Sequence, residues 1–316
     1  MKKIKVAFIG SGYMAEEYAR VINKKFKNDI IIVGATNKSH KRINNFVNKY
    51  NIKNHYTQIS KMMNDTNPDL VIICVNELST FKVLKIVSKY PCVSLIEKPV
   101  GINFEENQKI IKLKKNKAFH SFVALNRRFY SSIINSVKIL KKDHSKRIIN
   151  IFDQENIILA KLAGQPVKVL KNWMYANSIH MIDLIYYFGR GKIVKITKIS
   201  KDNYLKEGTV SCKITFSSGD IVNYFSLWNR PAPWSVEIST KNYFINLKPV
   251  EKVSYLKGKI RKWIQLDVSK NDTEFKPGIY LQLVEALKFI KKKKTKLKDL
   301  KYSNKLMKLI KDIYFD

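Results

Sequence analysis

Apolar residues in the first 124 positions occur either as short runs or, over longer stretches, at every third or fourth position. Short apolar runs are typical of buried parallel strands, and the longer spacing is typical of helices with one buried face. Strands are predicted at residues 3–9, 30–36, 70–75, 92–96 and 119–124. Helices are predicted at residues 13–26, 38–50, 81–89 and 104–115, the last capped by Asn103. This alternation predicts an α/β fold: a doubly wound parallel sheet with helices on both faces.

The pattern changes after about residue 148, where strands predominate. Residues 209–216 and 221–227 flank Ser217-Ser218-Gly219-Asp220, which predicts an antiparallel hairpin. Helices are predicted at residues 178–188, 279–290 and 302–314. We therefore expect two domains, an α/β domain at residues 1–122 and an α+β domain with a mainly antiparallel open sheet at residues 123–316.

The chain has 316 residues, of which 45% are apolar, so both domains can bury a core. Its 60 basic and 25 acidic residues give a net charge of +35, which attracts polyanions without specificity. The lysines are dispersed, as AT-rich codons would produce, and no nucleic-acid-binding motif is present. We expect no dedicated nucleic-acid partner. We also expect no membrane span, because no apolar run approaches the roughly 18–20 residues that a spanning helix needs.

The three cysteines, Cys74, Cys92 and Cys212, are scattered and form no CxxC pair. This excludes a disulfide framework and a cysteine-built zinc site, and we expect no bound metal. The N-terminal residues superficially resemble a signal peptide, but Lys5 interrupts the apolar stretch, which a secretory core does not tolerate. We therefore expect a cytoplasmic protein.

A glycine-rich turn joins the first predicted strand to the first predicted helix. Its sequence, which matches G-x-G-x-x-A, is Gly10-Ser11-Gly12-Tyr13-Met14-Ala15. Gly10 permits a tight turn, Gly12 lets a pyrophosphate approach the backbone, and Ala15 allows the helix to pack closely on the strand. The diphosphate then meets the helix N-terminus, where N–H groups and the helix dipole attract an anion. In this context the motif predicts a bound dinucleotide.

The end of the second predicted strand bears on the choice between NAD and NADP. An acidic residue there normally binds the adenosine ribose of NAD, but this chain has Asn37 at that position. Lys38, Ser39 and Arg42 follow, and these side chains can bind a 2′-phosphate. NADP is therefore favoured over NAD.

Three further motifs follow the glycine turn in a fixed order. They are E-K-P at residues 97–99, N-R-R-F at residues 126–129 and H-x-x-D at residues 180–183. With the glycine turn, their order and spacing resemble those of the glucose–fructose oxidoreductase and inositol dehydrogenase (Gfo/Idh/MocA) oxidoreductases, over nearly the whole chain. The resemblance implies a Rossmann dinucleotide-binding domain followed by a substrate-binding and oligomerisation domain, commonly in a homodimer or homotetramer.

The resemblance also implies roles for individual residues. Lys98 takes the position of the catalytic-site lysine, and His180 that of the residue that exchanges the hydroxyl proton. Asp183 is the third expected catalytic residue: it lies on the same helical face as His180 and can orient the imidazole or a substrate hydroxyl. Besides residues 10–15, 37–39 and 42, the expected cofactor-binding residues are Asn76 and Glu97. The expected substrate-binding residues are Lys98, Asn126, Arg127, Trp173, Asn177 and His180.

Two departures from the family pattern concern the substrate. Many members have Asp four residues before the histidine, where this chain has Ala176, and Asn177 is a neutral candidate in its place. The usual T-P-x-x-x-H segment is replaced by Val75-Asn76-Glu77-Leu78-Ser79-Thr80. The aromatic segment from Trp228 to Trp234 is compatible with a sugar site, with core packing or with an oligomer interface.

These observations lead us to expect an NAD(P)-dependent oxidoreductase acting on the carbinol or ketone carbon of a small sugar-like or nucleotide-sugar substrate. Biliverdin-reductase-like and imine-reducing members of the family are enzymatic alternatives. A catalytically silent, nucleotide-binding relative that acts as a regulator is the alternative of a different class.

Overall fold

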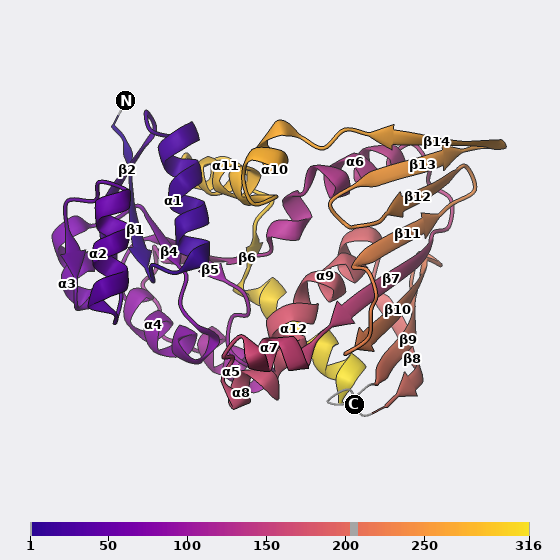
Figure 1. Cartoon of the computed structure of the whole chain (residues 1–316), viewed down its shortest axis with the longest axis horizontal. Coiled ribbons are helices and arrows are strands. Elements are labelled where there is room, and N and C mark those ends of the chain that lie inside the picture. The colour runs from indigo at the N-terminus through magenta and orange to yellow at the C-terminus, as the bar shows by residue number, and fades with distance from the viewer. Residues whose placement is uncertain (1, 203–207, 316) are drawn as a thin grey trace. The chain divides into compact units, whose positions relative to one another are not determined.

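The structure, a computed structural model, describes residues 2–202 and 208–315 (Figure 1). The chain forms two compact units, each with its own sheet. The first contains Met1–Leu125 and Ile279–Lys305, and the second contains Asn126–Gly278 and Leu306–Asp316. The expected boundary after residue 122 therefore lies three residues early. The expected second domain also differs, because residues 279–305 belong to the first unit.

The first unit is built on a parallel sheet with one antiparallel edge strand. In spatial order its strands are β15 (Lys298–Asp299), β6 (His120–Ala124), β5 (Val93–Glu97), β4 (Leu70–Ile73), β1 (Ile4–Ile9), β2 (Ile30–Thr36) and β3 (His55–Tyr56). Strands β4 and β1 are buried almost throughout, which explains their unbroken apolar sequences. Residues 279–305 join this unit because β15 pairs with β6.

Helices connect these parallel strands. They are α1 (Tyr13–Lys25), α2 (His40–Lys49), α3 (Ile59–Thr66), η1 (Glu77–Ser79), α4 (Thr80–Val87), α5 (Phe104–Ile111) and α11 (Ile279–Ile290). Helix α1 packs against α11, and α4 packs against α3 and α5. The predicted helices are confirmed, with α5 capped by Asn103 as expected. Helix α3 was not predicted, although Ile59, Met62, Met63 and Thr66 have helical spacing, because it is only eight residues long.

The second unit is built on an open sheet that is antiparallel except where β10 pairs with β7. In spatial order its strands are β14 (Ile260–Leu266), β13 (Val253–Lys257), β12 (Tyr243–Leu247), β11 (Ser235–Ser239), β7 (Ile148–Glu155), β10 (Ile221–Trp228), β9 (Thr209–Phe216) and β8 (Ile193–Lys201). The predicted hairpin is β9–β10, and the predicted mainly antiparallel sheet is confirmed.

Helices cover one face of this second sheet, so its strands alternate between buried and solvent-facing residues. The helical segments are η2 (Asn126–Phe129), α6 (Ser131–Leu140), α7 (Ile157–Leu162), α8 (Val167–Leu170), η3 (Met174–Ser178), α9 (Ile179–Phe188), α10 (Lys270–Glu274) and α12 (Leu300–Tyr314). Helix α9 packs on β7, and α6 packs on β12 and β13. Only the last part of α12 belongs to this unit.

Candidate active site

The glycine turn leaves an accessible backbone at the start of α1. Gly10 has a φ of +98°, and a Cβ atom there would lie 2.1 Å from the carbonyl oxygen of Cys74, so only glycine fits. Gly12 directly precedes α1, and a Cβ atom at Gly12 would meet nothing within 4 Å. The N-terminus of α1 therefore faces open space, which suits the pyrophosphate of a dinucleotide.

Asn37 is held by two hydrogen bonds beside this turn. Its Nδ2 donates to Ser11 Oγ at 2.7 Å, and its Oδ1 accepts from the backbone N–H of Ser39 at 2.9 Å. Ser39 is the N-cap of α2, and its hydroxyl accepts from the backbone N–H of Arg42 at 3.4 Å. The side chains of Lys38 and Arg42 are exposed. No carboxylate occupies this position, and two cations lie close to it in sequence.

Lys98 directly follows β5, and the preceding Glu97 is tied into the core of the first unit. The hydroxyl of Tyr18, a buried residue of α1, lies 3.1 Å from Glu97 Oε1 and 2.6 Å from Gln282 Oε1. Burial raises the pKa of Tyr18 well above its ordinary value, and the charge of Glu97 adds to the shift. Since it is fixed in this way, Glu97 holds the chain immediately before Lys98 in a defined position.

The first-unit candidates share one edge of the sheet. Strands β1, β2, β4 and β5 are parallel neighbours, so their carboxyl ends lie on the same side. Gly10 follows β1, Asn37 follows β2, Asn76 lies shortly after β4 and Lys98 follows β5. Ligands of doubly wound sheets bind at the carboxyl ends of the strands.

His180 is the second residue of α9 and is 7% exposed. Asp183 lies one turn further along the same helix and is an ion-pair partner of the buried Arg128. Its Oδ2 accepts from Arg128 Nε at 2.5 Å, and its Oδ1 accepts from Arg128 Nη2 at 2.7 Å. The guanidinium also lies over the ring of Tyr187. Both carboxylate oxygens of Asp183 therefore accept from Arg128 in a buried two-point ion pair.

Two expected substrate-binding residues converge on one carboxylate, that of Glu155. Trp173 Nε1 and Asn177 Nδ2 both donate to Glu155 Oε2, at 2.6 and 2.8 Å. Ser178 Oγ donates to Glu155 Oε1 at 3.2 Å. Glu155 is the last residue of β7 and is fully buried, so it ties the segment before α9 to the second sheet.

Asp153 lies two residues before Glu155 on the same buried face of β7. The hydroxyl of Tyr224 donates to Asp153 Oδ2 at 2.6 Å, while Oδ1 is buried without a hydrogen-bond donor among the described residues. Burial raises the pKa of Glu155 well above its ordinary value, and the charge of Asp153 raises it further. Sequence analysis missed this pair. Its signal is two acids at the apolar positions of the alternating sequence of residues 149–155.

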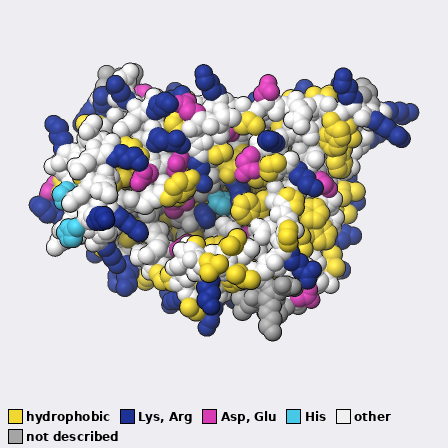
Figure 2. Space-filling model, viewed as in Figure 1, with side chains coloured by type: hydrophobic (Ala, Val, Ile, Leu, Met, Phe, Trp, Pro, Cys, Tyr) yellow, Lys and Arg dark blue, Asp and Glu magenta, His cyan; other side chains and the backbone are white. Residues whose placement is uncertain are grey.

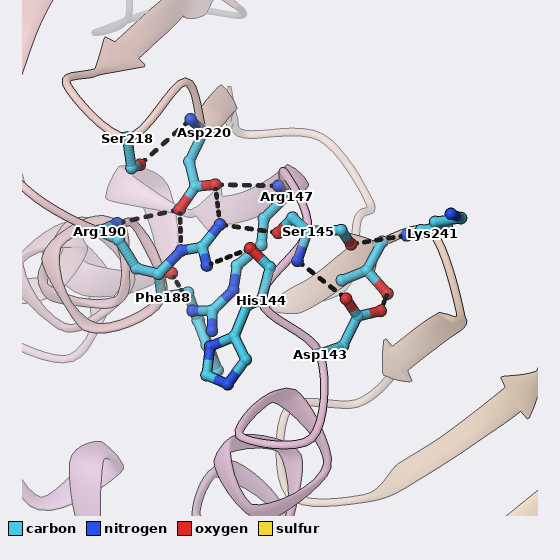
Figure 3. A network of polar contacts seen from close by, with 10 residues as sticks. Asp143, His144, Ser145, Arg147, Phe188, Arg190, Ser218, Asp220 and Lys241 are labelled. Carbon is cyan, nitrogen blue, oxygen red and sulfur yellow. Dashed lines mark hydrogen bonds and ion pairs between the residues drawn. The ribbon is translucent and has the colours of Figure 1, made fainter.

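The C-terminal end of α9 is anchored by a second polar network (Figure 3). Arg190 makes a two-point ion pair with Asp220, in the turn between β9 and β10, with Nη2–Oδ1 2.7 Å and Nε–Oδ2 2.8 Å. Arg147 Nη1 donates to the carbonyl oxygen of Phe188, the last residue of α9, at 2.8 Å. The helix that carries His180 is therefore held to the sheet at both ends.

Asn126 and Arg127 are buried in η2 and have packing partners. Asn126 Nδ2 donates to the carbonyl oxygen of Pro277 at 3.1 Å. The Arg127 guanidinium lies 4.5 Å from the ring centroid of Trp234. Trp228 is fully buried and makes an edge contact with Tyr314, so this end of the aromatic segment belongs to the core.

Across residues 2–202 and 208–315, the structure contains no group of three or more His, Cys, Asp or Glu side chains that could hold a metal ion. Within the same ranges, no helix has the length and apolar character needed to cross a membrane. Of the expected site residues, those up to Lys98 belong to the first unit, and those from Asn126 to Asp183 belong to the second.

Comparison with known proteins supports both the motif and the fold. Residues 4–124 match the GFO_IDH_MocA family, described as an oxidoreductase family with an NAD-binding Rossmann fold. No curated protein matches the chain.

Solved structures resemble the chain over nearly its whole length. A dehydrogenase from Chromobacterium violaceum has a TM-score of 0.84 at 18% identity, covering 99% of this chain and 94% of that one. An oxidoreductase from Desulfitobacterium hafniense, named as NADPH-dependent, has a TM-score of 0.81 at 14% identity, covering 98% and 94%. UDP-N-acetylglucosamine 3-dehydrogenase from Acidithiobacillus ferrooxidans has a TM-score of 0.78 at 12% identity, covering 99% and 97%. At these identities the likeness concerns the fold, and it confirms the predicted architecture.

Proposed function

We propose that the chain is an NAD(P)-dependent dehydrogenase or reductase, because residues 4–124 match the NAD-binding Rossmann fold of the Gfo/Idh/MocA oxidoreductase family. Its substrate is a sugar or nucleotide sugar, oxidised or reduced at a carbinol or ketone carbon. One observation carries this proposal. The uncovered backbone at Gly12 and the lysine after β5 occupy the same edge of the first sheet.

The cofactor supplies the hydride chemistry, and the chain supplies position and charge. The N-terminus of α1 holds the pyrophosphate. The ammonium group of Lys98 stabilises negative charge that develops on the substrate oxygen, and His180 exchanges the hydroxyl proton. Asp183 acts indirectly, by pairing with Arg128 and so stabilising the helix of His180.

We propose NADP as the preferred cofactor. Asn37 presents an amide where a carboxylate would repel a 2′-phosphate, and Lys38 and Arg42 are exposed cations nearby.

A nucleotide sugar, as an anionic substrate, is compatible with the positive charge of the chain. Lysine and arginine side chains are distributed over the visible surface (Figure 2), and the formal charge of +35 favours an anionic ligand. One of the similar structures is a UDP-N-acetylglucosamine dehydrogenase.

The uncovered face of the second sheet is the proposed surface for a homodimer or homotetramer. Hydrophobic side chains gather there (Figure 2). Phe152 of β7 and Phe225 of β10 stack with ring centroids 5.3 Å apart, and Ile148, also on β7, is exposed. A contiguous apolar patch of this kind is typical of an interface.

A cytoplasmic location is also part of the proposal. The three cysteines are free thiols, as a cytoplasmic protein would have.

The test is NADPH oxidation with a panel of keto sugars and UDP-keto sugars, together with the reverse reaction. His180→Ala and Lys98→Met should each reduce turnover by about 10²–10⁴-fold while leaving NADPH affinity nearly unchanged. Because both groups serve one transition state, the double variant should lose less than the product of the two factors. His144→Ala, an exposed histidine of the second unit, is the matched control. Unchanged turnover in both variants would refute the assigned roles. NADPH binding without turnover across the panel would favour a silent, nucleotide-binding relative.

A further inference from the structure

The buried pair on β7 is unusual because two acids face the same apolar interior. Asp153 is 0% exposed and Glu155 is 1% exposed. Their neighbours on the parallel strand β10 are Ser226 and Trp228, and Trp228 is fully buried. Two negative charges cannot be held this close together in so apolar a setting without a proton or a cation between them.

The groups around the pair supply hydrogen bonds rather than direct neutralisation. On β10, Tyr224 donates to Asp153 Oδ2. On α12, the hydroxyl of Tyr314 lies 3.2 Å from that of Tyr224 and donates to Ser226 Oγ at 2.8 Å. Burial raises the pKa of Asp153, and it outweighs the opposing effects of the hydroxyls of Tyr224 and Ser178 and of the positive charge of Arg127 on η2.

A proton shared by the two carboxyl groups accounts for this arrangement. Two ionised carboxylates on one buried face only accept hydrogen bonds and repel each other, whereas a proton on one of them can be donated to the other. Asp153 Oδ1 is buried without a donor among the described residues, which is the condition that such a proton would relieve.

The same pair fixes the segment that leads into α9. Glu155 accepts hydrogen bonds from Trp173, Asn177 and Ser178, which span the π-helical turn η3. His180 follows this turn by two residues. We propose that Asp153 and Glu155 share one proton and act as positioning residues that set the start of the His180 helix. The catalytic importance of that helix rests on the proposed function. The shared proton and the hydrogen bonds from Trp173, Asn177 and Ser178 to Glu155 do not depend on it.

Two variants separate the shared proton from the hydrogen bonds. Glu155→Gln imitates the protonated carboxyl group, because its oxygen still accepts from Trp173 and Asn177 and its amide donates towards Asp153. Glu155→Leu has a similar volume and makes neither interaction. Asp153→Asn removes the other acid.

Infrared spectroscopy on the full chain tests the shared proton without any substrate. The wild type at pH 7 should show the C=O stretch of a buried carboxylic acid, and both Glu155→Gln and Asp153→Asn should lose it. Absence of this band from the wild-type minus Glu155→Gln difference spectrum would overturn the shared proton.

The indole N–H resonance of Trp173, assigned with Trp173→Phe among the four tryptophans, tests the positioning role. It should remain at its wild-type position in Glu155→Gln, but move and exchange with solvent at least tenfold faster in Glu155→Leu. An unchanged resonance in Glu155→Leu would overturn the role. If Glu155→Leu does not fold, Asn177→Ala and Trp173→Phe each remove one donor, and each should shift the infrared band. A band that stays in place in both variants would likewise contradict the role.

Turnover then connects the pair to the proposed function. Glu155→Gln should keep most activity up to neutral pH and extend it to higher pH, because its amide cannot lose the shared proton. A pH profile identical to that of the wild type would show that the pair does not act through His180. Failure of the proposed function itself would appear as absent turnover in the wild type, with the infrared and NMR results unaffected.

Discussion

The glycine turn of the first unit and the surroundings of His180 in the second unit are built in different ways. The turn is contiguous in sequence and works through backbone geometry, with Gly10 confined by Cys74 and Gly12 left uncovered. The His180 helix is held by buried side chains from distant parts of the chain, among them Arg128 and Glu155. A site built from backbone can be recognised as a motif, whereas one built from buried charges depends on partners that no motif contains.

The ion pair between Arg128 and Asp183 should produce the largest effect on stability. Asp183→Asn leaves the Arg128 guanidinium buried without its counter-charge, so the free energy of unfolding should fall by about 3–5 kcal/mol. Urea denaturation followed by circular dichroism measures this loss. Asp65→Asn is the matched control, since Asp65 pairs with Lys61 on an exposed helix face, and it should cost at most about 0.5 kcal/mol.

The double variant Arg128→Met/Asp183→Leu should recover most of the lost stability, because neither charge is then left alone in the core. A loss in Asp183→Asn as small as in the control would show that the helix of His180 does not depend on this pair.

Substitution of the two glycines of the turn should affect different properties, cofactor affinity at Gly12 and stability at Gly10. Gly12→Val should fold normally, because its side chain enters open space, yet weaken NADPH binding at least a hundredfold, about 2.7 kcal/mol. Gly10→Ala should instead lower stability by about 2–4 kcal/mol, because of its positive φ and its contact with Cys74. Fluorescence titration and thermal unfolding distinguish the two results. Unchanged NADPH affinity in a folded Gly12→Val variant would show that the cofactor does not bind at this turn.

Asn37 should account for a smaller effect, on cofactor choice. Asn37→Asp places a carboxylate near the ribose, while the Ser11 hydroxyl can still donate to it, so the fold should be retained. NADPH affinity should fall about tenfold relative to NADH, a change of about 1.4 kcal/mol. A tenfold preference of the wild type for NADH would contradict the proposed role of this pocket.

Acid should weaken the ion pair between Arg190 and Asp220 at the C-terminal end of α9. We expect this to change the free energy of unfolding by less than the effects above. Burial opposes ionisation of Asp220, but hydrogen bonds from Arg190 and Arg147 outweigh it and hold the pKa of Asp220 below its ordinary value. Its contribution to stability is therefore complete above the unfolded-state pKa of about 3.9 and is lost as the pH falls through the lower, folded-state value. Urea midpoints between about pH 6 and pH 3 should decline less steeply in Asp220→Asn. If the urea midpoint has the same dependence on pH in Asp220→Asn as in the wild type, Asp220 does not contribute to the loss of stability in acid.

Much of the fold could be predicted from the sequence because the pattern of each element is local. Strands β2 and β9 and helix α11 have the predicted bounds, since apolar and β-branched residues continue along each strand and apolar residues recur at helical spacing along α11. The glycine turn was predicted for the same reason, because its strand, turn and helix are adjacent in the chain.

The sequence alone determined the two-domain α/β architecture, the dinucleotide turn and the position of His180 on a helix. Only the tertiary structure decided that residues 279–305 complete the first unit, because the pairing of β15 with β6 joins strands far apart in the chain. It likewise decided that Asp183 pairs with Arg128 and that Trp173 and Asn177 meet at Glu155. Residue type shows that a side chain can donate or accept a hydrogen bond. The partner is chosen by burial, which excludes water and leaves the nearest complementary group as the only low-energy option.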